Sequence, residues 1–383
     1  MPRRPSCGCG RWGTSATSSA DTLTKRRQRW WSQSGGRQGF CGFQLNDTEH
    51  QRGTIMIQGE LLRALCAVGA VESATDTEGF FMASRTDKGV HAAGLLVQLW
   101  MNNLHIGQQA AFVQAVNAEL QRRGKPASQI KVFDVVMAPW LESAGGQQPL
   151  RVNSCKLCVQ REYLYVVPSF ALAPVATETK TVDAMRSHMR RFRISKAQLA
   201  AADQVLSAYV GEGSFALFTP PNKSAVYQQE EGGTDRSISN CTCTAFPPQI
   251  KHGVQFVAIV ICGDRYMYHQ IRNMMGLAML CIHAALDPRH VIASVLHGGP
   301  LPGGEKTPPL APAAPLLLNT LHYGDLRVVD FLQRNTAQVR AFREQQLLPQ
   351  VYHSAQNPMA EFVTELLCTG GPVSRLQKAA RSK

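Results

Sequence analysis

One short segment, residues 83–92, brings together the side chains of this sequence best suited to chemistry. It reads Ala-Ser-Arg-Thr-Asp-Lys-Gly-Val-His-Ala and lies between two apolar stretches. Asp87 is flanked by Arg85 and Lys88, and neighbouring positive charges favour the ionised form of a carboxyl group. An ionised carboxylate can act as a nucleophile, and Gly89 permits a tight backbone where a substrate would approach. The residues leave open the alternative of a surface turn with a solvated ion pair.

Two further segments hold polar groups in apolar surroundings. Residues 162–167 alternate aromatic and aliphatic side chains and predict a strand that carries Tyr163 and Tyr165 on one face. Arg272 lies on a predicted helix among apolar neighbours. A charge on an apolar helix face requires a partner, which favours a buried ion pair over a solvated arginine.

These segments resemble, in the same order, the motifs of the TruA-type tRNA pseudouridine synthases. The stretch Ser-Arg-Thr-Asp-Lys-Gly-Val-His-Ala resembles the catalytic motif of the eukaryotic tRNA pseudouridine synthase 1 branch. Three more stretches take part: Gly-Phe-Cys-Gly-Phe-Gln at 39–44 with Thr-Ile at 54–55, Arg-Glu-Tyr-Leu-Tyr at 161–165, and Tyr-His-Gln-Ile-Arg-Asn-Met-Met-Gly at 268–276. The resemblance extends over residues 39–325.

The resemblance implies a tRNA pseudouridine synthase that isomerises specific uridines to pseudouridine. Asp87 would be the catalytic aspartate and would attack the target uridine at C1′ of the ribose or at C6 of the base. The N-glycosidic bond then breaks, and the uracil turns and rejoins through C5. Because this is an isomerisation, no metal, redox or nucleotide cofactor is expected. The expected partner is tRNA, with mRNA or snRNA as further RNAs.

The resemblance also implies roles for three other residues. Arg272 would pair with Asp87 and keep it anionic, for which a bidentate arginine–carboxylate pair is well suited. Tyr163 would stack on the uracil and could accept the proton from C5, while Tyr165 would serve the core. Arg85 would help to extrude the target nucleotide from helical RNA by taking its place in the stack.

Other polar residues near these motifs are assigned to RNA contact or to structure. Thr86 is expected to shape the catalytic loop, and His91 and His269 to form structural hydrogen bonds rather than act as acids or bases. Solvated surface charge is the alternative for the basic residues. The candidates for an RNA-binding surface are Lys88, Lys156, Arg161, Lys223, Arg236 and Arg265.

Two other functions compete with the synthase. The first is a catalytically impaired RNA-binding protein of the same fold, although binding alone does not require Asp87, Tyr163 and Arg272 together. The second is a hydrolase that uses Asp87 on a nucleoside or sugar. Glycoside hydrolysis generally uses two carboxyl groups, and only one is found here.

Composition and charge agree with a folded RNA-binding enzyme. The chain has 383 residues, of which 44% are hydrophobic and 17% charged, and its net charge is +13. A basic protein suits a polyanionic partner. No apolar run approaches the ~18 residues of a membrane span.

The first 38 residues hold eight basic side chains and one acidic one. We expect a nucleus-located protein, with the mitochondrion as the alternative because an arginine-rich, acid-poor start is also typical of a transit peptide.

The 11 cysteines are expected to be reduced thiols, because the chain is long and several of them lie in apolar surroundings. A zinc site formed by Cys155, Cys158, Cys241 and Cys243 is possible in principle. The signal is weak, because no histidine or cysteine pair accompanies them with zinc-finger spacing.

The predicted elements favour an α+β fold. Amphipathic helices are expected at 54–68 with Thr54 as cap, at 108–123, at 195–210 with Ser195 as cap, and over 18 residues from Met267. Strands are expected at 95–100, 130–137, 162–167, 254–261 and 316–323, and loops at 138–152 and 298–315.

The resemblance specifies the pseudouridine synthase fold: two similar α+β halves, a largely antiparallel central sheet and an active-site cleft between the halves. The catalytic domain is expected over 39–330, with halves at 39–150 and 151–330, followed by a partly helical basic tail at 331–383.

Residues 1–38 are interpreted as an unstructured basic segment. The family's first strand should occupy about residues 27–38, but this stretch has no β-branched residue and no alternation. One hypothesis is an error in the predicted coding sequence upstream of Gly39; the other is a targeting segment.

Overall fold

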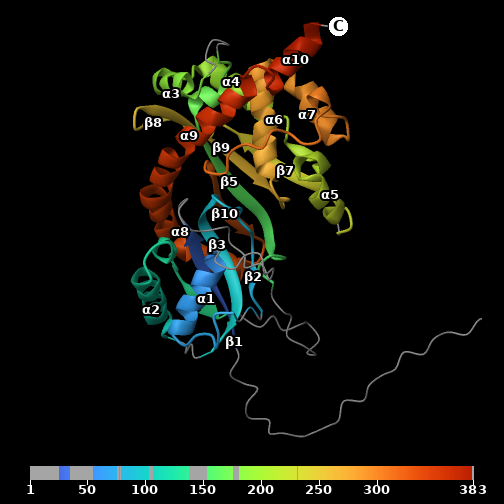
Figure 1. The fold of residues 1–383 in the computed structure, drawn as a ribbon. Helices are drawn as coiled ribbons and strands as arrows, with labels where there is room; N and C mark the ends of the chain where they lie inside the picture. Colours follow the sequence, from blue (N-terminus) through green and yellow to red (C-terminus); the bar gives the residue numbers. More distant parts are fainter. Residues whose placement is uncertain are drawn as a thin grey trace, which may run out of the picture.

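A mixed β-sheet of ten strands runs through the molecule and carries the site (Figure 1). The computed structural model describes residues 26–34, 55–75, 77, 79–102, 107–137, 153–175, 181–230 and 232–381. The strand order is β4-β1-β3-β10-β5-β9-β7-β6, with β2 paired to β3 and β8 paired to β9. The strands are β1 (Arg26–Ser34), β2 (Phe81–Met82), β3 (His91–Met101), β4 (Val135–Met137), β5 (Cys158–Pro168), β6 (Gly211–Ser214), β7 (Asp235–Thr242), β8 (Gln249–Lys251), β9 (Val254–Gly263) and β10 (Leu316–Tyr323).

Strand β10 joins the two parts of this sheet. It runs parallel to β3 and antiparallel to β5, and every other pairing in the sheet is antiparallel. The predicted α+β class and the largely antiparallel sheet are therefore confirmed.

The helices cover the sheet in two groups. Helices α1 and α2 flank the end that holds β1 and β3, and α3 to α7 gather at the other end (Figure 1). Helix α9 packs on β5, while α8 contacts β3 and β10. The helices are α1 (Ile57–Ala67), α2 (Gln109–Arg122), α3 (Val182–Arg191), α4 (Lys196–Ser207), α5 (Pro221–Tyr227), α6 (Gln270–Ala284), α7 (Pro288–Leu296), α8 (Leu326–Phe342), α9 (Leu348–Leu367) and α10 (Pro372–Arg381).

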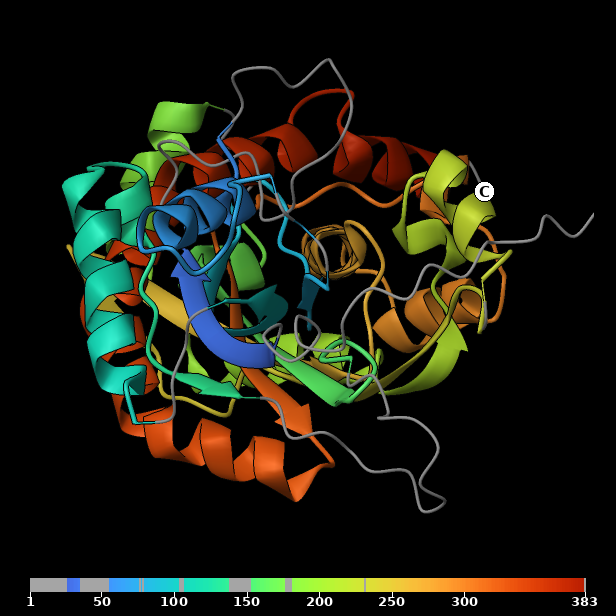
Figure 2. The same cartoon turned by 90° about the horizontal axis from the view of Figure 1, so that it is seen from below.

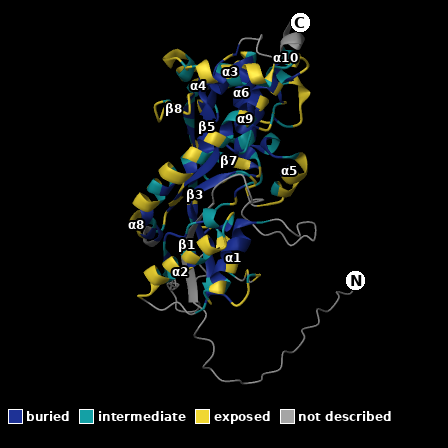
Figure 3. Cartoon of the chain, turned by 60° about the vertical axis from the view of Figure 1, so that its left-hand side comes forward, coloured by how far each residue is buried: buried dark blue, intermediate teal, exposed yellow. Residues whose placement is uncertain are grey.

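Helix α6 lies in the interior, where Figure 2 shows it nearly end-on. Thirteen of its 15 residues are buried, and Arg272 and Ala284 are the exceptions. In Figure 3 the buried residues follow the sheet and α6, while exposed residues mark the outer faces of α2 and α8. Arg272 is therefore the one charged side chain on an otherwise buried helix.

Most predicted elements are present with shifted ends. Helices α1, α2, α4 and α6 and strands β3, β5, β9 and β10 match expected segments. Ser195 caps α4 through a capping box with Gln198, as its side-chain type predicts. The strand expected at 130–137 is limited to β4. The prediction of Thr54 as the helix cap is wrong, because α1 begins at Ile57 with Met56 at its N-cap position. The motif at 39–44 and the loop expected at 138–152 lie outside the described residues.

The interpretation of residues 1–38 as unstructured is wrong for residues 26–34. These form β1, which pairs antiparallel with β3 on one side and with β4 on the other. Ladder hydrogen bonds come from backbone groups, so a strand can form without the β-branched residues that the prediction required. The chain does supply a strand near the position where the family's first strand was expected.

The partly helical tail expected at 331–383 is helical, as α8, α9 and α10 show, but it does not project from the domain as a tail. Helix α9 buries Val351, Ala355 and Met359 fully, although Pro358 lies inside it. Residues 331–381 belong to the packed structure. Within the described ranges, no helix is both long and apolar enough to cross a membrane.

Candidate active site

The loop between β2 and β3 presents Asp87. Its tight turn has the backbone N–H of Val90 donating to the carbonyl of Asp87 at 3.1 Å, and Gly89 has φ +81°. A left-handed φ favours glycine, as the sequence predicted for this position. The Asp87 side chain is 25% exposed, so it is partly buried yet can reach a ligand.

Tyr163 on β5 lies beneath this loop. Its hydroxyl forms a 2.8 Å hydrogen bond with the Ser84 hydroxyl, and its ring meets Tyr266 edge-on at 5.2 Å between centroids. Burial raises the pKa of Tyr163 to about 12, and the hydrogen bond with Ser84 opposes this shift. The hydroxyl is therefore protonated at neutral pH. Tyr165, two residues on, is fully buried and donates to the Pro312 carbonyl at 2.9 Å, in the core role expected of it.

Arg272 approaches the site from the first turn of α6. Its Nε donates to the carbonyl of Ala311 at 2.8 Å. This hydrogen bond fixes the guanidinium between α6 and the segment that precedes β10. Burial raises the pKa of Asp87, and the positive charge of Arg272 opposes that rise. Burial likewise lowers the pKa of Arg272, and Asp87 opposes that change.

The two side chains thus interact electrostatically, but among the described residues they do not form the direct ion pair that the sequence suggested. The Nε donor of Arg272 is occupied by the Ala311 carbonyl.

His269 lies beside Asp87 in the structure. Its Nε2 is 3.9 Å from the Asp87 Oδ2, and its ring stacks on Tyr268 at 3.7 Å. Its backbone is left-handed, with φ +66°, at the residue that precedes α6. Burial and then Arg272 lower the pKa of His269 to about 4, so the ring is neutral at pH 7.

Sequence reasoning assigned His269 to structure and did not place it beside Asp87. The available signal was its position three residues before Arg272 in one motif. Ser84 was likewise missed as the partner of Tyr163, and nothing in the sequence links two residues 79 positions apart.

Comparison with known proteins bears on this geometry. Residues 205–323 match the tRNA pseudouridine synthase family. The chain is 26% identical over 347 residues to the pseudouridylate synthase 1 homolog of Mus musculus, covering 86% of this chain and 71% of that protein. It is 24% identical over 357 residues to tRNA pseudouridine synthase 1 of Yarrowia lipolytica, covering 73% and 60%. It is 25% identical over 375 residues to the tRNA pseudouridine(27/28) synthase of Saccharomyces cerevisiae, covering 82% and 93%.

Residues 205–323 thus match the tRNA pseudouridine synthase family, and similarity at about 25% identity to pseudouridine synthases extends over most of the chain. Members of this family are isomerases.

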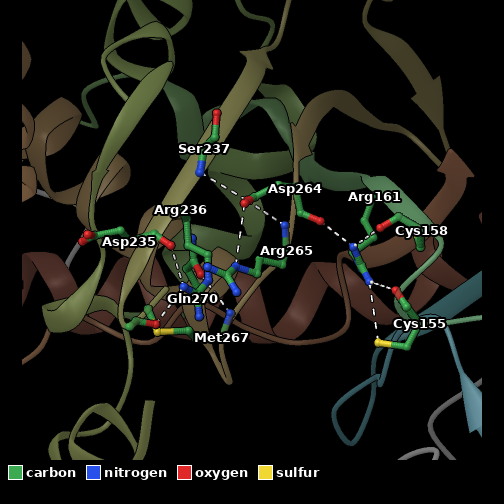
Figure 4. Close-up of polar contacts among 11 residues, drawn as sticks. Cys155, Cys158, Arg161, Asp235, Arg236, Ser237, Asp264, Arg265, Met267 and Gln270 are labelled. Carbon is green, nitrogen blue, oxygen red and sulfur yellow. Dashed lines mark hydrogen bonds and ion pairs between the residues drawn. The ribbon is translucent and has the colours of Figure 1, made fainter. Parts of the chain in front are cut away.

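Two basic residues expected at an RNA-binding surface are instead buried. Arg161 is 8% exposed, and its guanidinium donates to backbone carbonyls (Figure 4). Arg236 is 6% exposed, donates to the carbonyls of Gly233 and Asp235, and lies over the Tyr227 ring. Their prediction as RNA-binding residues is wrong, because neither guanidinium is accessible to a phosphate.

The remaining basic candidates for RNA contact lie at the surface. Arg85, Lys88, Lys156 and Lys223 are exposed. Arg265 is 45% exposed, with its Nε 3.8 Å from the Asp264 Oδ2. Thr86 and His91 are buried, in keeping with structural roles.

The cysteines proposed as zinc ligands are free thiols, as are Cys66, Cys262, Cys281 and Cys368. In the part of the chain that the structure describes, no group of three or more His, Cys, Asp or Glu side chains could hold a metal ion.

Proposed function

We propose that this protein is a tRNA pseudouridine synthase in which Asp87 is the nucleophile. The observation that carries the proposal is the position of Asp87. It is a partly buried carboxylate on a tight loop, under the influence of Arg272 and above Tyr163. The family match agrees with isomerisation rather than with hydrolysis.

In the proposed mechanism, the Asp87 carboxylate attacks C1′ of the ribose or C6 of the base of the target uridine. The N-glycosidic bond breaks, the uracil turns within the site, and C5 bonds to C1′ as the ester or adduct with Asp87 is released. The C5 proton leaves last and N1, freed from C1′, gains a proton, so the product is an isomer of uridine.

Arg272 and Tyr163, the neighbours of Asp87, have different roles in this mechanism. Arg272 stabilises the carboxylate by charge, because it opposes the rise in pKa that burial imposes. Tyr163 stacks on the uracil, which is worth ~1–3 kcal/mol per base. A protonated Tyr163 hydroxyl could take the C5 proton only by passing its own proton to Ser84, so stacking and positioning are the better-supported role.

RNA contact is assigned to exposed residues around the loop. Arg85, two residues before Asp87, would fill the place of the extruded nucleotide. Lys88, Lys156, Lys223 and Arg265 would meet the phosphate backbone. We propose tRNA as the main substrate, with mRNA or snRNA as further ones.

The finer fold assignment and the cellular setting are proposals as well. The two parts of the sheet on either side of β10 would be the similar halves of the pseudouridine synthase fold, with the active-site cleft between them. We propose a nuclear monomer, with the mitochondrion as the alternative location. Imaging of the full chain with a C-terminal fluorescent tag separates the two locations.

The decisive experiment is pseudouridine mapping on unmodified transcripts of the source organism's tRNAs. The full chain is compared with Asp87→Ala, and tRNA affinity is measured for both. New pseudouridines with the parent and none with Asp87→Ala, at a dissociation constant changed less than about threefold, support the proposal.

Two other outcomes contradict it. A parent that binds tRNA but makes no product is an RNA-binding protein of the same fold. Release of free uracil indicates a hydrolase.

A further inference from the structure

The Arg161 guanidinium donates mainly to main-chain oxygens, and its Nη2 also lies 3.9 Å from the Cys155 Sγ (Figure 4). Nε and Nη2 both donate to the carbonyl of Ala83, at 3.2 and 2.9 Å. Nη1 donates to the carbonyls of Asp264 and, at 3.2 Å, Cys158. Nη2 also donates to the carbonyl of Cys155 at 3.4 Å. No carboxylate takes part in these contacts, so the carbonyl dipoles solvate the buried cation.

The segments that Arg161 joins are the two walls of the site. Ala83 is the residue at which the loop bearing Asp87 begins. Asp264 directly follows β9 and begins the segment that leads to His269 and Arg272 on the other wall. One side chain on the central strand β5 therefore holds both walls.

The Asp264 end of this bridge is itself fixed to the sheet. Its backbone N–H donates to the Ser237 carbonyl at 3.1 Å, and its Oδ1 accepts from the Ser237 N–H at 3.2 Å. Oδ1 also accepts from the Arg265 N–H at 2.7 Å. Because this anchor is held on β7, the hydrogen bonds of Arg161 tie the Ala83 end of the loop to it, while the Ala83 N–H donates to the Leu96 carbonyl on β3 at 3.1 Å.

Only arginine supplies this set of contacts. The guanidinium offers five donors in a rigid planar fork, whereas a lysine ammonium offers three donors from a single atom. A lysine at this position could reach one wall but not span both. A displacement of reacting groups by about 1 Å can cost roughly 100-fold in rate.

We propose that Arg161 is a positioning residue that sets the distance between the loop of Asp87 and the segment of Arg272. It acts on the carboxylate through the backbone, by fixing how strongly the Arg272 charge acts on Asp87. This inference rests on the proposed function of the site.

The test compares Arg161→Lys with a matched control, Arg236→Lys. Arg236 is equally buried and also donates to carbonyls, but those belong to its own strand region, Gly233 and Asp235. Single-turnover pseudouridine formation, tRNA affinity and the pH–rate profile are measured for the parent and both variants.

For Arg161→Lys we expect a rate lower by about 100-fold, a tRNA dissociation constant within about threefold of the parent, and an acid limb moved to higher pH. The limb moves because a more distant Arg272 opposes the protonation of Asp87 less. Arg236→Lys is expected to keep the parent's rate and profile even if its melting temperature falls as far.

Three results overturn the positioning role. They are an Arg161→Lys variant with the parent's rate and profile, equal rate losses in the two variants, and a failure to fold of both Arg161→Lys and the neutral donor variant Arg161→Gln.

Hydrogen–deuterium exchange supplies a readout that does not depend on activity. Amides of residues 84–90 should exchange faster in Arg161→Lys than in Arg236→Lys. If the parent makes no pseudouridine, the proposed function fails, and unchanged exchange in this loop would then reject the positioning role separately.

Discussion

At the scale of the residue, Asp87 is governed by two opposing influences. Burial favours its neutral form, and Arg272 favours the carboxylate that a nucleophile must be. The nearest imidazole, His269, is neutral and adds no positive charge. The balance therefore depends on one guanidinium that makes no direct ion pair with Asp87.

Replacement of Arg272 by glutamine should move the acid limb of the pH–rate profile to higher pH. Loss of the cation removes the influence that lowers the pKa of Asp87, so the carboxyl protonates earlier as the pH falls. The rate at neutral pH should drop roughly 100-fold. Single-turnover rates between pH 5 and 8 measure both effects. Arg272→Lys keeps the charge and is the control; an acid limb shifted equally in both variants would show that charge is not the cause.

Tyr163 should tolerate loss of its hydroxyl better than loss of its ring. Tyr163→Phe removes the bond to Ser84 and is expected to lower kcat/KM by less than about tenfold, since a typical hydrogen bond contributes ~1 kcal/mol. Tyr163→Ala removes the stacking surface and should cost roughly 10- to 100-fold. A Phe variant as slow as the Ala variant would indicate that the hydroxyl takes part in proton transfer.

The sequence singled out Asp87, Tyr163 and Arg272 because each lies in a distinctive motif, and the structure places Arg272 and Tyr163 within electrostatic reach of Asp87; their catalytic roles stay predictions. It was insufficient for Arg161 and Arg236. The sequence does not distinguish an arginine that contacts RNA from one that donates to backbone carbonyls, because the difference lies in tertiary contacts. The pairing of Ser84 with Tyr163 was hidden for the same reason.

At the scale of the element, α6 is held against the segment that precedes β10. A Cβ added at Gly276 would overlap the carbonyl oxygen of Pro309. The same segment supplies the Ala311 carbonyl that accepts from Arg272. The close approach of helix and loop at Gly276 thus belongs to the construction of the site.

Gly276→Ala should therefore destabilise the fold by about 1–3 kcal/mol, as overpacking of a buried contact does. It should also lower the rate, since the Ala311 carbonyl must move. Chemical denaturation and single-turnover assays measure the two effects. Gly324→Ala is the matched control, because a Cβ there meets only Val159 at an ordinary 3.7 Å. A Gly276→Ala protein as stable as that control would contradict the contact.

Elements with a clear period were predictable from sequence, and those without one were not. The strand at 316–323 and the capped helix after Ser195 follow directly from alternation and side-chain type. Strand β1 has neither β-branched residues nor alternation, and β6 is Gly-Glu-Gly-Ser. Such strands are specified by the neighbours that pair with them, which a single sequence does not reveal.

At the scale of the whole molecule, buried His283 links stability to acidity. Burial lowers its pKa to about 4, whereas an unfolded histidine titrates near 6.5. Between those values the unfolded chain binds a proton that the folded chain does not. Stability from this group is therefore complete above about pH 6.5 and falls as the pH drops towards 4.

The loss attributable to His283 should reach about 3 kcal/mol at pH 4. Urea unfolding of the full chain and of His283→Gln, at pH 7, 6, 5 and 4, measures it. The variant should be less stable at pH 7 but should lose less on acidification. His290→Gln, at an exposed site, is the control; parallel curves for the parent and His283→Gln would rule out the assignment.

The placement of β10 has a consequence for how this protein is made. The strand that joins β3 to β5 is the last of the ten to leave the ribosome, at residues 316–323. Until then β3 and β5 each present an open edge of unpaired backbone groups, which invites pairing with other chains. A ribosome that stops before residue 316 releases two unjoined pieces of sheet, and the walls that Arg161 bridges acquire their common support only in the final part of synthesis.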